Sequence, residues 1–331
     1  MVLRAGLVGL GMMGQNHARV LQQIDGVQLV AVADPAGAGL VSLGAAQCVD
    51  DVDQLIEVGL DIAVVACPTE DHEQVALTLA AAGVHALIEK PLGIDVQSAL
   101  KITKAFADAG LVGAVGHIER FNPAIRSMRQ RLADGELGEL FQVGTRRIGP
   151  FPNRIRDVGV IKDLATHDFD LTSHVTGAEF VSIAAQTSHR AGREHEDLLA
   201  ATARLRSGVI SNHLVNWLTP FKERLVVAVG DRGAFVADTL TADLTLFRNA
   251  EAPMAWQGIS QFRGVAEGDM VRYAISKPEP LRVELEGFRD AVLGAGGEIV
   301  SMTEGLHAVA VADAALESAQ QDATVTIGAA L

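Results

Sequence analysis

The segment at residues 160–170 (VIKDLATHDFD) places polar side chains where an amphipathic helix would carry Leu and Val. Read as an α-helix, it puts Asp163, His167 and Asp170 at i, i+4 and i+7, so the three side chains share one face. This face could be an acid–base pair, a metal site or a solvated surface. A metal would want three or four ligands, and no further His or Cys partner is evident nearby. A histidine can instead take the proton of a secondary alcohol, with Asp163 one turn earlier to stabilise the charged imidazole.

A glycine-rich loop near the start of the chain has the spacing of a dinucleotide-binding site. Gly9, Gly11 and Gly14 form a G-x-G-x-x-G pattern between an apolar strand pattern and a helical one, and Asp34 ends the next predicted strand. We expect Gly9 to allow a tight turn, Gly11 to admit a pyrophosphate, and Gly14 to let helix and strand pack closely. The helix N-terminus attracts the phosphate charge. Asp34 should bind the ribose 2′-hydroxyl and repel a 2′-phosphate, which predicts NAD rather than NADP.

Residues 1–120 alternate between short apolar runs and helical patterns. Strands that are apolar throughout and separated by helices indicate a parallel sheet covered on both faces, so this part is predicted to be an α/β, doubly wound Rossmann domain. The predicted strands are 3–10, 27–34, 62–67, 85–89 and 111–117, and the predicted helices are 13–24, 51–58, 70–82 and 95–109.

The pattern changes after about residue 120. A helix is predicted over 122–135, with Asn122 as its cap. Longer alternating runs follow, joined by turn residues, and indicate an open, mostly antiparallel sheet of α+β type. Helical patterns return at 279–293 and 302–319, and these last helices could pack back anywhere on the molecule. We therefore predict an NAD-binding Rossmann domain over 1–120 and a substrate-binding and oligomerisation domain over 121–331.

Composition excludes several classes of protein. The 331 residues carry a formal net charge of −14, which disfavours nucleic acid and anionic membranes as partners. No run of about 18 apolar residues suggests a membrane span, and residues 1–10 do not resemble a signal peptide. The two cysteines, Cys48 and Cys67, form no C-x-x-C pair. A reducing, cytoplasmic location is therefore expected.

Three further motifs, together with the glycine loop, resemble those of the Gfo/Idh/MocA oxidoreductases. They are ACPTEDH at 66–72, EKPLG at 89–93 and DLATHDFD at 163–170, and their order matches that family over residues 1–180. The resemblance implies a Rossmann domain that carries NAD(P), and an open sheet that covers the active site and makes a homodimer or homotetramer. It also implies a cis peptide bond between Lys90 and Pro91.

The resemblance further implies roles for individual residues. Lys90, Asp163 and His167 would form the catalytic group, and His117 would lie where cofactor and substrate meet. The implied cofactor contacts are Gly9, Gly11, Met12, Met13, Gly14, Asp34, Pro68, His72, Glu89 and Lys90. Two of these keep a structural alternative, since Glu89 could pair with a neighbour and His72 could serve only the fold. His17 is expected to be structural, and no metal is expected.

An excess of arginine precedes the polar stripe. Residues 116–160 contain eight arginines, no lysine and five acidic residues in a chain that is acidic overall. Arginine forks suit phosphate oxygens. Arg126, Arg129 and Arg131 could be a plain helix surface. The residues better placed to meet an anionic substrate are Arg146, Arg147, Arg154 and Arg156, and Arg154 and Arg156 are the predicted substrate contacts beside His117, Asp163 and His167.

The segments GHIERFNPAI (116–125) and RDVGVIKDLATHDFDL (156–171) resemble the branch of the family that comprises UDP-N-acetylglucosamine 3-dehydrogenases. We therefore expect NAD-dependent oxidation of a secondary hydroxyl of a sugar or nucleotide sugar, at C3 of a UDP-N-acetylhexosamine. An inositol or free-sugar dehydrogenase is the alternative among enzymes. A non-catalytic NAD-binding redox sensor is the alternative from another class.

Overall fold

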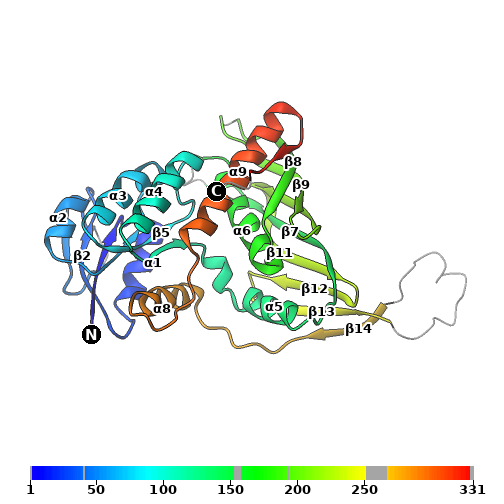
Figure 1. Ribbon diagram of the computed structural model, residues 1–331, viewed down its shortest axis with the longest axis horizontal. Helices are drawn as coiled ribbons and strands as arrows, with labels where there is room; N and C mark the ends of the chain where they lie inside the picture. The colour runs from blue at the N-terminus through cyan, green and yellow to red at the C-terminus, as the bar shows by residue number, and fades with distance from the viewer. Residues whose placement is uncertain (1, 40–41, 153–157, 193, 251–266, 329–331) are drawn as a thin grey trace, which may run out of the picture. The chain divides into compact units, whose positions relative to one another are not determined.

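The computed structural model divides into two compact units (Figure 1). Of the residues described below, the first unit comprises those within 2–121 and 278–313, and the second comprises those within 122–277 and 314–328. The described residues are 2–39, 42–152, 158–192, 194–250 and 267–328.

The first unit contains a parallel sheet of six strands among the residues described, in the order β3-β2-β1-β4-β5-β6. This confirms the predicted Rossmann sheet. The strand order reverses between β1 and β4, which is the point where such sheets bind ligands at their carboxyl edge. The strands are β1 (Leu3–Val8), β2 (Val27–Ala33), β3 (Gln47–Val49), β4 (Ile62–Val65), β5 (His85–Glu89) and β6 (Gly113–Gly116).

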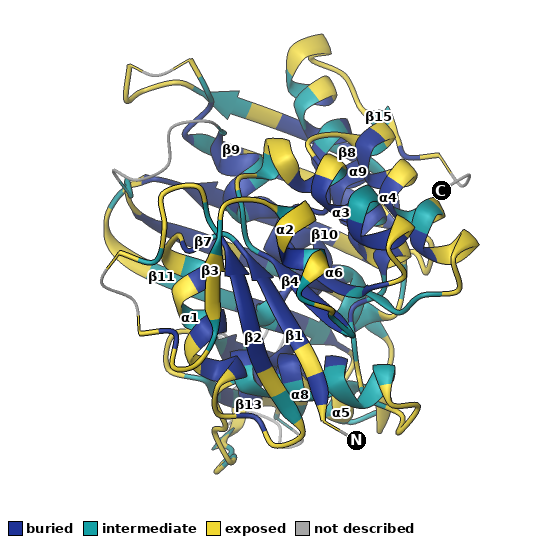
Figure 2. Ribbon diagram, turned by 90° about the vertical axis from the view of Figure 1, so that its left-hand side faces the viewer, coloured by how far each residue is buried: buried dark blue, intermediate teal, exposed yellow. Residues whose placement is uncertain are grey.

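Helices cover both faces of this sheet. The helices are α1 (Met12–Leu21), α2 (Val52–Glu57), α3 (His72–Ala81), α4 (Val96–Asp108), α8 (Pro280–Val292) and α9 (Met302–Gln321), whose residues up to Asp313 belong to this unit. One apolar core lies between the sheet and α2, α3 and α4, and the other lies between the sheet and α1 and α8. Figure 2 shows β1, β2 and β4 as largely buried strands. Asp95 caps α4, because its carboxylate accepts the Ser98 N–H at 2.8 Å.

The position of α8 corrects the predicted domain limits. The sequence predicts a second domain over 121–331 and leaves open where its last helices pack, and the structure places 278–313 with the first unit. The reason is an apolar stripe on α8. Leu281, Leu285 and Phe288, spaced at i, i+4 and i+7, are buried in the core that α1 shares with the sheet.

The second unit contains a sheet of nine strands among those described, in the order β14-β13-β12-β11-β7-β10-β9-β8-β15. Every neighbouring pair is antiparallel except β7 and β10, so the predicted open, mostly antiparallel sheet is confirmed. The strands are β7 (Leu140–Pro150), β8 (Phe180–Ser188), β9 (Leu198–Leu205), β10 (Ile210–Asn216), β11 (Leu218–Gly230), β12 (Gly233–Asp238), β13 (Asp243–Asn249), β14 (Glu267–Arg272) and β15 (Val325–Thr326).

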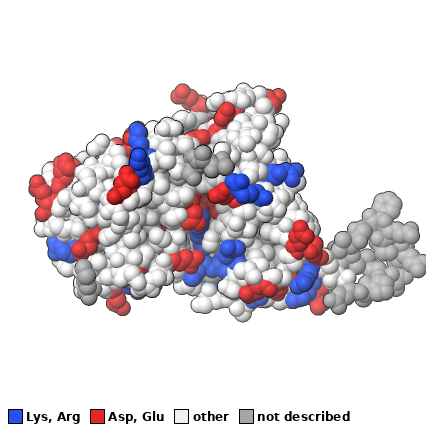
Figure 3. Space-filling view, viewed as in Figure 1, with Lys and Arg blue, Asp and Glu red and all other residues white. Residues whose placement is uncertain are grey.

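Two helices of the second unit pack on its sheet. They are α5 (Pro123–Ala133), which packs on β12 and β13, and α6 (Thr166–Thr176), which packs on β7. Charged side chains of both signs are interspersed on the face shown in Figure 3. Over the described part of the chain, no helix combines the length and apolar character needed to cross a membrane.

Candidate active site

The three glycines of the loop after β1 lie in two kinds of surroundings. Backbone atoms pack closely against Gly9 and Gly14, whereas Gly11 borders open space. Gly9 has φ +92°, and a Cβ there would lie 2.7 Å from the Ala66 carbonyl oxygen. A Cβ on Gly14 would lie 2.0 Å from the Gly9 carbonyl oxygen. Gly11 instead faces open space, because a Cβ there would meet nothing within 4 Å. The loop is therefore tight beneath and open above, which fits a pyrophosphate at the N-terminus of α1.

Asp34 directly follows β2 and lines a cavity beside the glycine loop. Its Oδ2 accepts the Leu10 N–H at 2.6 Å and its Oδ1 accepts the Ala36 N–H at 2.8 Å, so the carboxylate is fixed against the glycine loop. The cavity beside it has a volume of about 930 Å³. Its lining includes Leu10, Gly11, Gln15, Arg19, Gln22, Asp34 and Ala36. These residues fit the adenosine half of a dinucleotide, with one acidic group for the ribose hydroxyls.

Met12 and Met13 are the first residues of α1, and Met12 is 57% exposed. Pro68 precedes the short 3₁₀ turn Thr69–Asp71, and its carbonyl accepts the Asp71 N–H at 3.0 Å. His117 is buried directly after β6, and its N–H donates to the Val115 carbonyl at 2.8 Å. All of these predicted contacts therefore follow strands of the Rossmann sheet or begin its first helix.

Glu89 is buried at the end of β5 and pairs with His17 of α1. The His17 Nε2 lies 2.8 Å from Glu89 Oε1, and the Lys90 N–H donates to Glu89 Oε2 at 3.2 Å. Burial alone would raise the pKa of Glu89, but the hydrogen bond and charge of His17, with the charge of Lys90, outweigh it and lower that pKa. Glu89 is therefore an ionised carboxylate held within the protein. Of its two interpretations, the geometry supports the pairing with a neighbour.

His72 is buried at the start of α3 and bridges two loops. Its Nδ1 lies 3.0 Å from the Pro91 carbonyl oxygen and its Nε2 lies 3.2 Å from the Cys67 carbonyl oxygen. Burial lowers the pKa of His72, although the hydrogen bonds to both carbonyls oppose that shift. Because both ring nitrogens contact backbone, the geometry supports its structural interpretation. The Lys90–Pro91 peptide bond is cis, as predicted.

The polar stripe of the second unit begins in a π-helical turn. Ile161–Ala165 form this turn, which runs directly into α6. Asp163 lies in the turn and His167 in the first turn of α6, and both are 9% exposed. The sequence predicted a regular α-helix here. Such π turns are frequent at functional sites because they shift the side chains that follow.

Glu196 and Gly159 lie beside the polar stripe, and the sequence analysis did not single them out. Glu196 accepts the Ile161 N–H at 2.9 Å and so holds the start of the π turn. Gly159 leaves room for it, since a Cβ there would lie 2.1 Å from the Glu196 carboxylate. Asp168 follows His167 and is 1% exposed, while Asp170 is 2% exposed. The stripe is therefore buried, which does not agree with a solvated helix surface.

The arginines before the stripe have separate environments. Arg147 is buried, and its Nε donates to Asp168 Oδ1 at 2.7 Å. This corrects the expectation that Arg147 meets an anionic substrate, because a buried guanidinium bound to a carboxylate is already engaged. Arg146 is half exposed and lies 3.5 Å from the carboxylate of Glu223. Arg154 and Arg156, the predicted phosphate contacts, lie outside the described residues.

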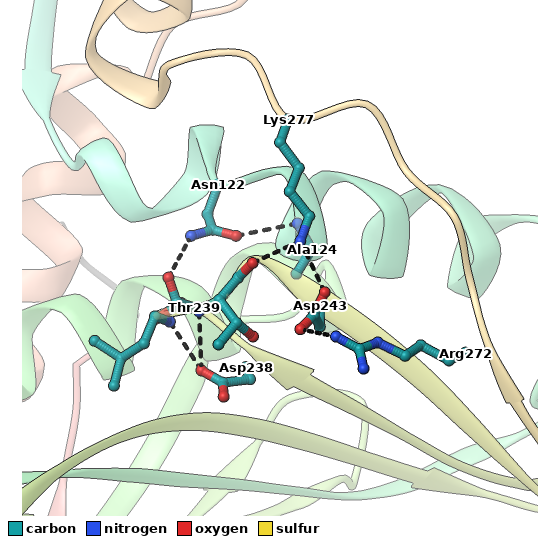
Figure 4. Close-up of polar contacts among 9 residues, drawn as sticks. Asn122, Ala124, Asp238, Thr239, Asp243, Arg272 and Lys277 are labelled. Carbon is teal, nitrogen blue, oxygen red and sulfur yellow. Dashed lines mark hydrogen bonds and ion pairs between the residues drawn. The ribbon is translucent and has the colours of Figure 1, made fainter.

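Asn122 caps α5, as predicted. Its Oδ1 accepts the Ala124 N–H at 3.0 Å, and its Nδ2 donates to the Thr239 carbonyl at 2.9 Å (Figure 4). Lys277 donates to Asp243 in the same network, at 2.8 Å. These contacts fasten α5 to the turn between β12 and β13, and they give Asn122 a structural role.

Among the residues that the structure describes, metal ligands do not gather in either unit. Over the described ranges, no group of three or more His, Cys, Asp or Glu side chains could hold a metal ion. Burial, followed by the negative charge of Asp71, raises the pKa of Cys67 to about 12, so this thiol stays protonated near neutral pH.

Comparison with known proteins identifies the family. Residues 3–117 match the oxidoreductase family with an NAD-binding Rossmann fold, and residues 125–236 match the GFO/IDH/MocA C-terminal domain. The chain is 31% identical over 295 residues to UDP-N-acetylglucosamine 3-dehydrogenase of Acidithiobacillus ferrooxidans, which covers 88% of each protein. The chain belongs to the Gfo/Idh/MocA family.

Other members of the Gfo/Idh/MocA family align over nearly the whole chain. Inositol 2-dehydrogenase of Rhizobium meliloti is 29% identical over 99% of this chain and 100% of its own length. A solved structure of the Acidithiobacillus ferrooxidans UDP-N-acetylglucosamine 3-dehydrogenase superposes with a TM-score of 0.84 at 26% identity, covering 97% of this chain and 98% of the other. The protein is thus an NAD(P)-dependent dehydrogenase of this family that acts on hydroxyl groups.

Proposed function

We propose that this Gfo/Idh/MocA dehydrogenase oxidises a secondary hydroxyl of a nucleotide sugar, at C3 of a UDP-N-acetylhexosamine, with NAD as oxidant. The observation that carries the proposal is the buried stripe of Asp163 and His167 in a chain that also has an NAD-binding Rossmann domain. The substrate class is supported by the similarity to UDP-N-acetylglucosamine 3-dehydrogenase.

The residues of the stripe would handle the proton of the reacting hydroxyl. His167 accepts that proton, and Asp163 on the preceding turn orients the imidazole and stabilises its charged form. Lys90 polarises the hydroxyl oxygen and stabilises the negative charge that develops on it. NAD, when bound, supplies the acceptor for the hydride of the ring carbon.

The preference for NAD over NADP rests on Asp34. Its carboxylate is fixed by two backbone N–H groups and lines the cavity next to the glycine loop. Gly9, Gly11, Met12, Met13 and Gly14 would bind the pyrophosphate at the start of α1. A carboxylate in this place accepts hydrogen bonds from ribose hydroxyls and repels the charge of a 2′-phosphate.

The substrate pyrophosphate would be bound by Arg154 and Arg156, and His117 would contact the sugar. Arg146 gives partial support, because it is a half-exposed guanidinium on β7, the strand that leads to this segment.

A homodimer or homotetramer through the second sheet is part of the proposal. Its support is a set of exposed apolar side chains on that sheet, which includes Phe141, Phe221, Phe247 and Met270.

One other substrate class has specific support. An inositol dehydrogenase is favoured by the near full-length similarity to inositol 2-dehydrogenase, and it would leave the arginines without a substrate role. The membership in a dehydrogenase family does not favour the alternative of a redox sensor that binds NAD without chemistry, for which Lys90, Asp163 and His167 would be dispensable. A cytoplasmic location remains a prediction from cysteine usage.

A substrate screen tests the proposal. The purified protein is incubated with NAD and UDP-N-acetylglucosamine, UDP-N-acetylgalactosamine, free hexoses or inositols, and NADH absorbance is followed. We expect the fastest reaction with a UDP-N-acetylhexosamine. Rapid turnover of inositol with no reaction of any nucleotide sugar would contradict the substrate class, and no turnover of any alcohol would favour the sensor.

A further inference from the structure

The backbone on each side of the Lys90 side chain is held by a buried polar group. On one side, the Lys90 N–H donates to Glu89 Oε2 at 3.2 Å. On the other, the carbonyl oxygen of Pro91 lies 3.0 Å from His72 Nδ1. The peptide segment that presents Lys90 is therefore fixed at adjacent residues.

Each holding group is itself anchored to another element of the Rossmann sheet. Glu89 Oε1 is 2.8 Å from the Nε2 of His17, which lies on the helix that follows the glycine loop. His72 Nε2 is 3.2 Å from the carbonyl oxygen of Cys67, just beyond the end of β4. The segments after β1, β4 and β5 are thus connected to one another at Lys90.

The protein keeps these polar groups almost entirely from water. His17 is 0% exposed, His72 is 1% and Glu89 is 7%. Space for Glu89 depends on Gly116 of β6, since a Cβ there would lie 3.0 Å from the Glu89 carboxyl carbon. Burial of two imidazoles and a carboxylate is costly unless their hydrogen bonds offset it, so the arrangement demands a specific geometry.

We propose that His17, His72 and Glu89 are positioning residues that fix Lys90 for its reaction, and that they act without contact to the cofactor. This inference rests on the catalytic role proposed for Lys90. Nothing in the similarity to other dehydrogenases assigns such a role to the two histidines. The consequence is that loss of either anchor lowers kcat through Lys90 and leaves the affinity for NAD nearly unchanged.

A double-mutant cycle tests the inference. His72→Ala and Glu89→Ala are each made alone and in a Lys90→Ala background, and kcat, KM and the Kd of NAD are measured with the substrate that the screen identifies. We expect each single change to lower kcat roughly 10–100-fold, as misplacement of a catalytic group by about 1 Å does. In the Lys90→Ala background the same change should lower kcat no further. If His72 or Glu89 had only a structural role, its removal would lower kcat by the same factor in the wild-type and the Lys90→Ala backgrounds.

Two further variants serve as controls. Glu89→Gln keeps an oxygen that can accept the Lys90 N–H and an amide that can meet His17, so it should recover much of the kcat lost in Glu89→Ala. His85→Ala removes a histidine from the opposite end of the same strand, where its Nδ1 accepts the Val112 N–H at 2.9 Å. It should lower the melting temperature and leave kcat unchanged.

A second readout does not depend on the substrate. The rate at which an amine-acylating reagent labels Lys90 is measured by mass spectrometry, with Lys101 and Lys104 of α4 as internal references. In His72→Ala, the rate at Lys90 should change severalfold relative to the references. An unchanged Lys90 rate, or a kcat loss that is fully additive with Lys90→Ala, overturns the inference. Full activity of Lys90→Ala itself would instead contradict the proposed function.

Discussion

The guanidinium of Arg147 and the carboxylate of Asp168 form an ion pair, Nε to Oδ1 2.7 Å, with the two side chains 4% and 1% exposed. The pair joins β7 to α6, and Asp168 directly follows His167 on that helix. A charge buried in this way depends on its partner, because neither group can be solvated by water when the other is removed.

Removal of one partner of this buried pair should therefore lower the free energy of unfolding far more than removal of one partner of a surface pair. We expect Asp168→Ala or Arg147→Ala to lower the free energy of unfolding by about 3–5 kcal/mol. The control is Glu179→Ala, which breaks the exposed pair with Arg206 and should cost at most about 1 kcal/mol. Urea unfolding followed by tryptophan fluorescence measures both. Equal losses for the two pairs would contradict the structural role given to Arg147.

Removal of the proposed base should affect the chemical step. We expect His167→Ala to lower kcat by about 10²–10⁴, the usual contribution of a general base, with little change in NAD affinity. Asp163→Asn keeps the shape but removes the negative charge that favours the imidazolium. The acidic limb of its pH–kcat profile should move to lower pH, and activity at the optimum should fall.

The same helix should work without a metal ion. EDTA treatment is expected to leave kcat unchanged, since the proposed chemistry uses His167 and Asp163 as proton-handling groups. Loss of activity in EDTA with recovery in zinc would show instead that the stripe binds a metal. If His167→Ala keeps wild-type kcat at every pH, the base lies elsewhere and Lys90 becomes the first candidate.

Cofactor choice should depend on Asp34. NAD is expected to bind at least about tenfold more tightly than NADP, a difference of roughly 1.4 kcal/mol, and Asp34→Ala should shrink that difference. Calorimetric titration of wild type and variant with both cofactors measures it. Equal affinities in the wild-type protein would contradict the assignment of Asp34 to the ribose.

A buried histidine should make the second unit sensitive to acid. His213 of β10 lies 2.8 Å from Thr145 Oγ1 and 3.0 Å from Ser211 Oγ. Its ring also contacts Phe169 of α6, with centroids 5.1 Å apart. Burial lowers the pKa of His213 to about 3. The folded protein therefore keeps this imidazole neutral at pH values where the unfolded chain, with a pKa of about 6.5, binds a proton.

The sign of the pH effect follows from this difference. Because only the unfolded state takes up the proton, stability is retained above pH 6.5 and is lost as the pH falls from about 6.5 towards 3, by at most about 1.4 kcal/mol per pH unit. We expect His213→Gln to flatten this dependence, whereas His189→Gln, at an exposed site, should not. Urea unfolding between pH 7 and pH 4 gives the slopes. Identical slopes in His213→Gln and wild type would show that other groups cause the acid sensitivity.

The Rossmann unit could be predicted from sequence because its signals are local. Continuous apolar strands, the Gly9–Gly14 spacing and the cap at Asp95 are each readable within a few residues. By contrast, β3 is short and mostly exposed, so it leaves no apolar run to detect. The amphipathic pattern of α8 was visible as a helix, but periodicity does not say which sheet will cover its apolar stripe.

The sequence was sufficient to identify the main residues of the candidate site, but it did not predict which side chains contact one another. Asp163 and His167 stood out as polar residues in an apolar segment. The π turn was hidden because its sequence satisfies an α-helical pattern equally well. The pairings of Arg147 with Asp168 and of His17 with Glu89 join residues far apart in the chain, and single-sequence patterns carry no information about such partners.

Hydride transfer from a sugar carbon to NAD is the central claim, and isotope transfer tests it most directly. The protein is incubated with NAD and UDP-N-acetylglucosamine that carries deuterium at C3, and both products are analysed by mass spectrometry. We predict that deuterium appears in the reduced cofactor while the sugar becomes a 3-ketone. Reduced cofactor without deuterium, or a sugar that keeps its deuterium while NADH forms, would contradict oxidation at C3.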